Sequence, residues 1–425
     1  MKYHIQSSPL SGTLPIPPSK SHTMRAILFG LLGEGKTTLY NGLRSPDTLA
    51  MLKAIQLLGA EVQTFPDRLE IIGKGPKISP AEDIIHAGNS GQILRFIGAV
   101  VGLLPSYTVI TGDHSIRYNR PIKPLLNALK ELNVFAESMR GDGYAPILIK
   151  GPLQGGKTTL DGQDSQPVSG MLIAACFSPH PTEIFVKNPG EKPWIDLTLH
   201  WLDFLGIHYE NHQYTHYKIQ GGAHYSGFNY TIPSDFSSLA FPLAVALVTR
   251  SSVTLENIDM SDVQGDKKLI ETLVHMGAKL TIDQSTLQIA AGSNLQGAKL
   301  DINDYIDSIT ILAVLGCYAE GETQITNAAI ARKKECDRIH AIVTELKKMG
   351  ADIEEKEEGL IVRRSKLKGA HLKSYQDHRM VLSLTVAALG ATGASTIDGV
   401  ECVNKTYPTF SRDMQKLGAQ IKEEL

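Results

Sequence analysis

Short polar clusters that precede apolar runs are the residues of this sequence best suited to chemistry. Ser19, Lys20 and Ser21 come a few residues before the apolar run of residues 26–32, and Arg25 lies one helical turn after Ser21. Backbone N–H groups and the dipole at a helix N-terminus attract anions, and adjacent Lys or Arg side chains strengthen the attraction. One such cluster, taken alone, also fits an ordinary helix cap with solvated charges.

The same design recurs further along the chain, which favours a site over isolated caps. Gly91 in the segment GNSG would let the backbone approach a ligand, and Arg95 follows one turn later. Ser165 and Gln166 precede Pro167, which we expect at the first position of another helix.

The second half of the chain adds carboxylates to these cations. Asp307 precedes a largely apolar run, and Glu335 lies between Lys334 and Arg338. On one helix Lys334 and Arg338 would share a face, because they are four residues apart. A solvated charged face would explain that segment by itself, but the recurrence of such clusters indicates a site for ligands with several negative charges. Its cations would be Lys20, Arg25, Arg120, Lys334, Arg338, Arg379 and Lys405.

Two segments, residues 30–37 and 151–158, match the phosphate-loop pattern G-x-x-x-x-G-K-[ST]. A phosphate loop needs a strand before it and a helix after it. The first segment follows a helical pattern and the second leads into TTLDG, which cannot form a helix. We therefore interpret both as glycine-rich turns and not as part of a nucleotide triphosphatase.

A recurring phrase predicts the elements that position these clusters. Six times an amphipathic helix ends in an apolar residue, then Gly or Asn, then a strand; this Gly or Asn stands at positions 59, 133, 206, 277, 350 and 418. Gly and Asn accept the left-handed conformation that ends a helix. Each repeat of about 71 residues also carries a nearly all-apolar helix, which we expect to be buried on most faces. Six such units predict two α/β lobes of three repeats with a ligand cleft between them.

Composition narrows the classes of function. The chain has 425 residues, 42% of them hydrophobic, and a net charge of −2, so nothing marks it globally as a nucleic-acid or membrane-surface binder. Its apolar runs are shorter than the ~20 residues of a spanning helix, and its start has no apolar signal segment. The four cysteines are far apart, so we expect free, mostly buried thiols, no metal site and a cytoplasmic location.

The motifs PPSKSHTMRA, GNSG, NRPIKPLL, DSQ, RKKECDRIHAIVTELKKMGADIEE, DHRM and CVNKTYP, in this order, resemble those of 5-enolpyruvylshikimate-3-phosphate synthases (3-phosphoshikimate 1-carboxyvinyltransferases). The resemblance runs from about residue 10 to 420 and implies a two-lobed inside-out α/β barrel of six βαβαββ repeats. We expect a C-terminal lobe of residues 1–17 and 235–425, to which the N-terminal strand returns, and an N-terminal lobe of residues 18–234.

The resemblance also implies a reaction. The enolpyruvyl group of phosphoenolpyruvate is transferred to the 5-hydroxyl of shikimate 3-phosphate through a tetrahedral intermediate, and phosphate is released. This is a step of chorismate and aromatic amino-acid biosynthesis. It needs no metal or organic cofactor, and a monomer is expected.

Each expected site residue follows from a matched motif. Phosphoenolpyruvate would contact Lys20, Gly91, Arg120, Gln166, Arg338, Arg379 and Lys405. Shikimate 3-phosphate would contact Lys20, Ser21, Arg25, Ser165, Gln166, Asp307 and Lys334. Asp307 would take the 5-hydroxyl proton, Glu335 would protonate the methylene carbon, and Lys20 would touch both substrates. Such chemistry requires two carboxyl groups in opposite protonation states.

Several positions depart from the family pattern. Gln92 replaces a small hydroxyl residue, Asp164 and Ser165 replace two serines, Glu191 replaces a serine, and Ile330 replaces an asparagine. An acid beside a phosphate subsite is unfavourable unless it binds hydroxyls or pairs with a cation such as Lys192. We therefore predict an active synthase with a remodelled subsite, in which Asn89, Asp164 and Glu191 are further candidate contacts.

Two other interpretations remain open to test. Enolpyruvyl transferases that act on UDP-N-acetylglucosamine carry a reactive Cys before an Arg-Pro pair, and GDHSIRYNRP has none. A silent homologue that only binds ligands would not need the retained acid and base, Glu335 and Asp307. Because Gly91 is present, the resemblance also implies a pocket open to glyphosate, which would compete with phosphoenolpyruvate.

Overall fold

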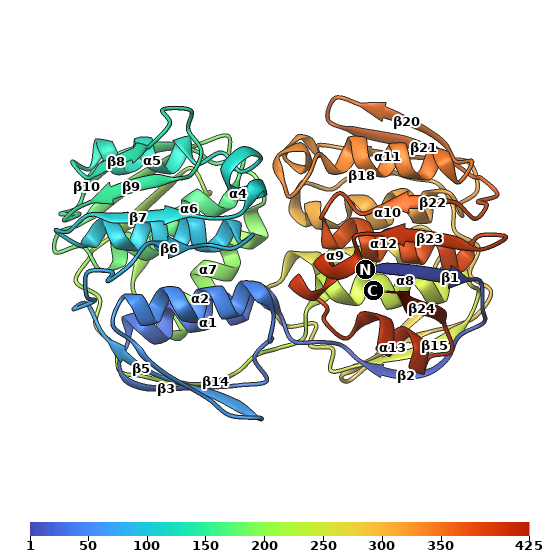
Figure 1. Ribbon diagram of the computed structural model, residues 1–425, viewed down its shortest axis with the longest axis horizontal. Coiled ribbons are helices and arrows are strands. Elements are labelled where there is room, and N and C mark those ends of the chain that lie inside the picture. Colours follow the sequence, from blue (N-terminus) through green and yellow to red (C-terminus); the bar gives the residue numbers. More distant parts are fainter. Residues whose placement is uncertain (425) are drawn as a thin grey trace. The chain divides into compact units, whose positions relative to one another are not determined.

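The computed structural model describes residues 1–424, which fall into two compact units, described separately below. The N-terminal unit is Pro18–Ile232, and the C-terminal unit is Met1–Pro17 together with the chain from Pro233 onward. Within the described residues each unit holds three four-stranded sheets (Figure 1). The predicted α/β class is confirmed.

In the N-terminal unit the helices are α1 (Lys20–Leu32), α2 (Pro46–Leu57), η1 (Ile93–Ile97), α3 (Gly98–Val100), η2 (Val101–Leu103), α4 (His114–Tyr118), α5 (Lys123–Glu131), α6 (Ser165–Cys176) and α7 (Lys192–Phe204). Its strands are β3 (Glu34–Tyr40), β4 (Glu61–Thr64), β5 (Arg68–Lys74), β6 (Ile85–His86), β7 (Thr108–Thr111), β8 (Phe135–Ser138), β9 (Ile147–Lys150), β10 (Gly156–Asp161), β11 (Thr182–Lys187), β12 (Tyr209–His212), β13 (His216–Ile219) and β14 (Asn229–Thr231).

In the C-terminal unit the helices are α8 (Phe236–Val248), η3 (Gly265–Lys267), α9 (Lys268–His275), η4 (Asn303–Ser308), α10 (Ile309–Gly316), η5 (Ala329–Lys333), α11 (Arg338–Lys348), α12 (His378–Gly390), η6 (Val400–Lys405) and α13 (Phe410–Lys416). Its strands are β1 (Lys2–Gln6), β2 (Ser11–Pro15), β15 (Ser252–Glu256), β16 (Leu280–Asp283), β17 (Thr286–Ile289), β18 (Lys299–Asp301), β19 (Glu322–Thr326), β20 (Asp352–Lys356), β21 (Gly359–Arg363), β22 (His371–Lys373), β23 (Ser395–Asp398) and β24 (Gln420–Glu424).

All six sheets share one topology. In the sheet β18-β19-β21-β20 the first two strands are parallel, and the others pair antiparallel. The same order recurs in the sheets β6-β7-β9-β8 and β10-β11-β13-β12. A common topology is the structural counterpart of the sequence repeat.

Two strands next to the unit boundaries pair with strands that lie far from them in the sequence. Strand β2 precedes α1 in the chain but pairs with β15 of the C-terminal unit. Strand β14 precedes α8 but pairs with β3 of the N-terminal unit. Strand β1 lies between β23 and β24, which brings both ends of the chain to one sheet (Figure 1).

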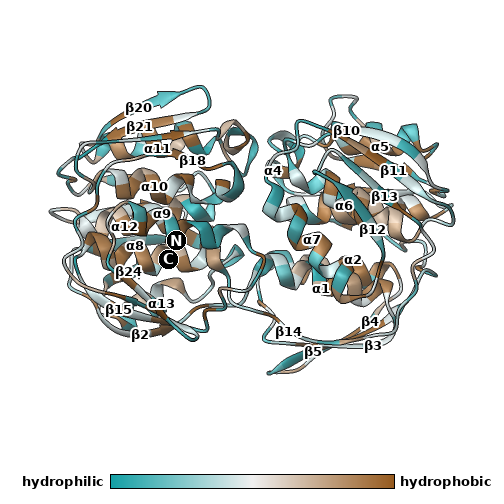
Figure 2. Ribbon diagram, turned by 180° about the vertical axis from the view of Figure 1, so that it is seen from behind, coloured by the Kyte–Doolittle hydropathy of each residue, from teal (hydrophilic) through white to brown (hydrophobic). Residues whose placement is uncertain are grey.

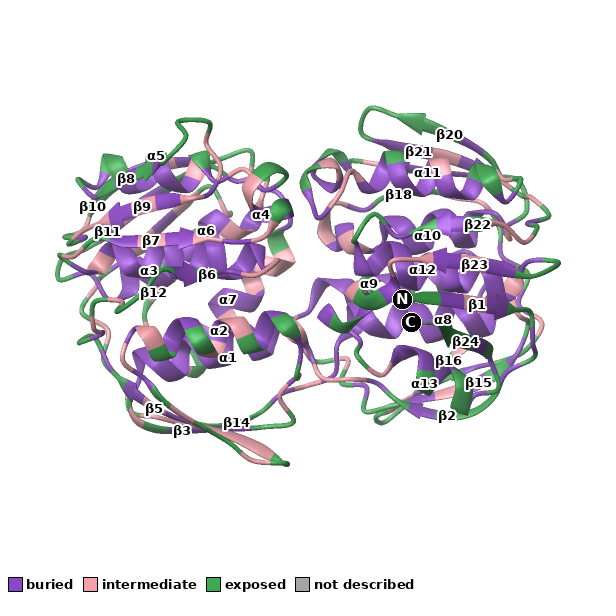
Figure 3. Cartoon of the chain, in the orientation of Figure 1, coloured by how far each residue is buried: buried purple, intermediate pink, exposed green. Residues whose placement is uncertain are grey.

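The nearly all-apolar helices form the cores, as predicted. Every residue of α8, α10 and α3 is buried, as are nearly all residues of α1, α6 and α12. Helices α8, α10 and α12 are largely brown in the hydropathy colouring (Figure 2), and the core helices are largely purple in the burial colouring (Figure 3). Helix α12 packs against α8 and α10 in one core, and α6 packs against η1 and α3 in the other.

The six predicted helix ends are confirmed by their backbone angles. Gly59, Asn133, Gly206, Gly277, Gly350 and Gly418 all have positive φ, from 61° to 105°. The two segments that match the phosphate-loop pattern end in strands β3 and β10 and not in helices, so they are turns as interpreted. All four cysteines are free, with Cys176 and Cys317 buried. None of the helices formed by residues 1–424 is long and apolar enough to span a bilayer.

Candidate active site

The expected site residues gather at the starts of core helices. Ser19 caps α1 by accepting the backbone N–H of His22, which makes Lys20 the first helical residue. Asp164 caps α6, and Asp377 caps α12. The capped ends are also where backbone N–H groups accumulate, so this placement suits anionic ligands.

Three side chains of the N-terminal unit, those of Arg95, Arg120 and Gln166, converge around Gly91. A Cβ atom at Gly91 would lie 2.9 Å from Arg95 Nη1, 2.9 Å from Gln166 Oε1 and 3.2 Å from Arg120 Nη1. Arg120 is 4% exposed, and the Oε1 atom of Gln166 is buried without a hydrogen-bond partner among residues 1–424. Two guanidinium groups beside a residue without a side chain can bind a small anion, and the Gln166 side chain can donate to that anion only through its amide N–H₂ group.

Among residues 1–424, no carboxylate neutralises the buried cation Arg25. Its side chain is 1% exposed, and its guanidinium donates to Thr198 Oγ1 at 3.0 Å, to the Ser21 carbonyl at 3.2 Å and to the Trp194 carbonyl at 3.0 Å. Burial lowers the pKa of the Arg25 guanidinium to about 9, so it remains charged at neutral pH. A buried charge held only by neutral acceptors is electrostatically incomplete, and an anionic ligand would complete it.

Lys20 and Asn89 have acidic neighbours in the same unit. Lys20 Nζ lies 3.7 Å from Asp47 Oδ2, in the first turn of α2. Asn89 donates to Asp113 Oδ2 at 2.6 Å, and that residue caps α4. The loop that carries Gly91 is therefore tied to the start of α4.

The two unusual acids have specific structural partners. Asp164 pairs with Arg95 at 2.9 Å, so its charge is balanced within the protein. Glu191, which is 1% exposed, accepts both the backbone N–H and the hydroxyl of Ser165 at 3.0 Å. Glu191 thus fixes the position of Ser165, the first residue of α6. Lys192, which we considered as a partner for an acid, lies over the Tyr214 ring.

The C-terminal unit holds an ion-pair network that we call the acid–base cluster, formed by Asp307, Glu335, Arg338, Asp377, Arg379 and Lys405. Arg338 donates to Asp307, Glu335 and Asp377, each at 2.7 Å. Arg379 donates to Asp307 at 2.6 Å, and Lys405 donates to Glu335 at 2.6 Å. The two carboxyl groups expected to do the chemistry are therefore both held by cations expected to bind substrate.

These contacts set the protonation states of the cluster. Burial disfavours the ionised form of Asp307, but Arg379, Arg338 and Lys334 outweigh it and hold its pKa well below the usual range. Burial likewise disfavours the charge on Arg338, but Asp377, Glu335 and Asp307 raise its pKa well above the usual value. The Nε atom of Arg379 is buried without an acceptor among residues 1–424.

Two local predictions are wrong. Lys334 and Arg338 do not share a helix face, because α11 begins at Arg338 after the cap Asp337, and Lys334 has non-helical backbone just after η5. Helix α6 begins at Ser165 and not at Pro167, since Asp164 is the cap. Arg338 still reaches Glu335, because the side chains meet across the helix start.

Sequence reasoning missed the role of Asp377. Its carboxylate is fully buried, accepts two bonds from Arg338 and accepts the backbone N–H of Arg379 at 2.8 Å. The signal was present, since an Asp directly before an apolar helix is a strong capping signal. Ser237 was also missed; its hydroxyl accepts from Arg379 Nη2 at 3.0 Å.

Cations at the starts of core helices, on a repeated α/β scaffold, are typical of proteins that bind small anionic substrates. A model of the EPSP synthase (3-phosphoshikimate 1-carboxyvinyltransferase) family matches residues 5–414. The chain belongs to this family.

Individual relatives agree over the full length. The 3-phosphoshikimate 1-carboxyvinyltransferase of Acetivibrio thermocellus is 43% identical over 421 residues, 99% of each chain. That of Methanocaldococcus jannaschii is 39% identical and covers 97% of each chain. The solved EPSP synthase of Acinetobacter baumannii superimposes with a TM-score of 0.84 at 27% identity over 99% of each chain.

Proposed function

We propose that the residues described above carry out the reaction of the family in this chain. That reaction is the transfer of the enolpyruvyl group from phosphoenolpyruvate to the 5-hydroxyl of shikimate 3-phosphate, a step of aromatic amino-acid biosynthesis. The observation that carries the residue assignment is the acid–base cluster, in which two carboxyl groups share three cations at 2.6–2.7 Å.

Substrate binding is assigned to both units. Phosphoenolpyruvate is assigned to Lys20, Gly91, Arg120, Gln166, Arg338, Arg379 and Lys405, and shikimate 3-phosphate to Lys20, Ser21, Arg25, Ser165, Gln166, Asp307 and Lys334. The convergence of Arg120 and Gln166 on Gly91 supports the first set. The buried, un-neutralised charge of Arg25 supports the second.

The reaction requires the two carboxyl groups to act in opposite senses. Glu335 gives a proton to the methylene carbon of phosphoenolpyruvate, and Asp307 takes the proton of the attacking 5-hydroxyl. A C–O bond forms at the central carbon. The ionised Glu335 then takes a proton back from the methyl group as phosphate leaves, which restores the C=C bond in an enol ether. Cations stabilise the charge that grows on the departing phosphate.

Without substrate, the ion pairs within the acid–base cluster keep Asp307 ionised, and substrate binding changes these ion pairs. While Arg338 and Arg379 hold Asp307, the carboxylate is a weak base, because its pKa lies far below the usual range. Phosphate and carboxylate groups of the substrates compete for the same guanidinium groups. Their binding therefore raises the proton affinity of Asp307 and Glu335 when both substrates are present.

Phosphate release on mixing the two substrates tests the function, and two isosteric variants test the residue roles. Asp307→Asn and Glu335→Gln are expected to fold normally and to lower kcat by about 100- to 10,000-fold, the usual contribution of an acid or base. Asp304→Asn is the matched control, because Asp304 lies in the same helix η4 and makes a partly exposed ion pair with Lys268. Wild-type rates in either variant would contradict the assigned roles, and no phosphate release from the wild type would contradict the function.

We further propose a cytoplasmic, monomeric enzyme. The family acts on two small substrates, and each unit contains its own buried core. Light scattering coupled to size-exclusion chromatography is expected to give the chain mass of 46.3 kDa.

A further inference from the structure

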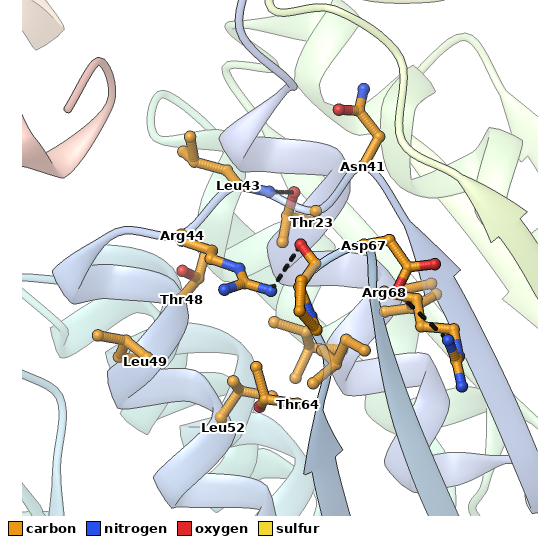
Figure 4. A pocket seen from close by; sticks show the side chains of 15 residues that line it. Thr23, Asn41, Leu43, Arg44, Thr48, Leu49, Leu52, Thr64, Asp67 and Arg68 are labelled. Carbon is orange, nitrogen blue, oxygen red and sulfur yellow. Dashed lines mark hydrogen bonds and ion pairs between the residues drawn. The ribbon is translucent and has the colours of Figure 1, made fainter. Parts of the chain in front are cut away.

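The N-terminal unit contains a cavity that the proposed chemistry does not use. It measures about 420 Å³ and lies among α1, α2 and the sheet that contains β3, β4 and β5 (Figure 4). Cavities that hold small ligands generally have volumes of about 300–1,000 Å³. None of the residues assigned to substrate lines it.

The walls are mostly apolar. Ile27 and Leu39 form buried walls from α1 and β3, while Leu49 and Leu52 of α2 and Leu69 of β5 border the opening. Leu49 is 55% exposed, so much of its side chain lies in water. An apolar body that filled this space would remove these leucine side chains from water, which is favourable at about 25 cal/mol per Å².

One cation at the rim is available to a ligand. Nη2 of Arg44 donates to the carbonyls of Phe65 and Pro66, and these bonds orient the guanidinium. The bond to Pro66 is drawn in Figure 4. Within residues 1–424, Arg44 makes no ion pair with a carboxylate, and its Nε and Nη1 groups make no hydrogen bond. The other rim charges, Arg68 and Asp67, pair with one another at 3.3 Å.

We propose that this cavity binds a small molecule with an apolar, ring-sized body and one carboxylate. The body occupies the space among Ile27, Leu39 and Leu69, and the carboxylate accepts from the Nε and Nη1 groups of Arg44. Charge-assisted bonds to a guanidinium are the stronger kind of hydrogen bond, so the anionic group fixes the orientation of the ligand.

The cavity is coupled to the start of α1. Thr23 lines the cavity, donates its hydroxyl to the Ser19 carbonyl at 2.7 Å and accepts the backbone N–H of Leu43 at 3.1 Å. Thr48 also lines it, and the adjacent Asp47 pairs with Lys20. An occupant therefore contacts both helices that position Lys20, and we infer that it changes the affinity for shikimate 3-phosphate. This second part rests on the proposed function.

Binding is tested directly with the probe 2-naphthoate and its uncharged analogue 2-naphthylmethanol, by isothermal titration calorimetry on the full chain. We expect a Kd below about 1 mM for 2-naphthoate and at least about tenfold weaker binding of the alcohol, which lacks the charge. Two variants locate the site. Arg44→Gln removes the cation, and Thr64→Trp fills the cavity from an exposed position of β4.

Both variants are expected to weaken 2-naphthoate at least about tenfold, whereas Arg412→Gln, an exposed arginine of α13, is expected to leave it unchanged. Thermal melting of each variant shows that it is folded. No binding at 10 mM probe, equal binding of acid and alcohol, or wild-type affinity in both variants would overturn the site.

The effect of the cavity ligand on shikimate 3-phosphate binding is measured separately. Saturating 2-naphthoate is expected to change the Kd of shikimate 3-phosphate at least about twofold in the wild type and not in Thr64→Trp. Binding of the probe with no such change would overturn the coupling and leave the cavity assignment standing. Absence of shikimate 3-phosphate binding in any sample would instead count against the proposed function.

Discussion

Gly91 has no side chain, and adding one carbon atom there tests the phosphoenolpyruvate assignment most directly. In Gly91→Ala the new Cβ would lie 2.9 Å from Arg95 Nη1 and Gln166 Oε1, against the 3.4 Å at which ordinary contact begins. The atoms that must move are the ends of flexible side chains, so the fold is expected to lose about 1 kcal/mol or less. The anion site is expected to lose much more, because Gln166 and Arg120 are displaced together. Misplacement by 1 Å can cost about 100-fold, so we expect kcat/KM for phosphoenolpyruvate to fall roughly 10- to 100-fold, mainly through KM.

The assay is phosphate release at saturating shikimate 3-phosphate, with phosphoenolpyruvate varied. Gly98→Ala is the matched control, since its Cβ would meet nothing closer than Leu125 Cδ2 at 3.4 Å. Both variants should melt within a few degrees of the wild type. If Gly91→Ala kept a KM within twofold of Gly98→Ala, the inference that Gln166 and Arg120 form the phosphoenolpyruvate subsite would be refuted.

Three further predictions follow from the same contacts. Arg25→Gln is expected to raise the KM for shikimate 3-phosphate at least about tenfold, because it removes a buried charge that no carboxylate within residues 1–424 neutralises. A KM within twofold of the wild-type value, measured by steady-state kinetics, would contradict this. Because its folded pKa is lowered, Asp307 stabilises the fold above its unfolded value near 3.8 and loses that contribution as pH falls below it. Urea unfolding should therefore show the stability advantage of wild type over Asp307→Asn to be constant above about pH 5 and to shrink below about pH 4. Glyphosate is expected to inhibit in competition with phosphoenolpyruvate, and a lack of inhibition at millimolar concentration would show that Gln92 has reshaped the pocket.

Features that depend on a few neighbouring residues were predictable from the sequence. The helix ends at Gly59 and Asn133 follow from the left-handed angles that these residue types accept. The core helices follow from their uniform apolar character. The candidate site was predictable in its residue types, because Lys and Arg at helix starts suit anions whatever the tertiary fold.

Features that depend on distant pairing were not predictable. Nothing local to Arg338 shows that its guanidinium contacts Asp307 and Asp377, which are 31 and 39 residues away in the chain. The same holds for Glu191, whose structural use became clear only from its bonds to Ser165, 26 residues earlier. The error at Lys334 was different in kind, since Asp337 before an apolar run is a readable helix start.

The exchange of terminal strands has a consequence for synthesis on the ribosome. Residues 18–232 are contiguous, so the N-terminal unit can fold as soon as it has emerged. Strand β1 must wait for β23 and β24, whose partners to Ile5 are Ser395 and Ile421. At typical rates of 5–20 residues per second that delay is roughly 20 to 80 s. For that time β1 remains without its sheet, and β2 likewise lacks its partner until β15 has emerged, so this first segment is the part of the chain most in need of chaperone protection during synthesis.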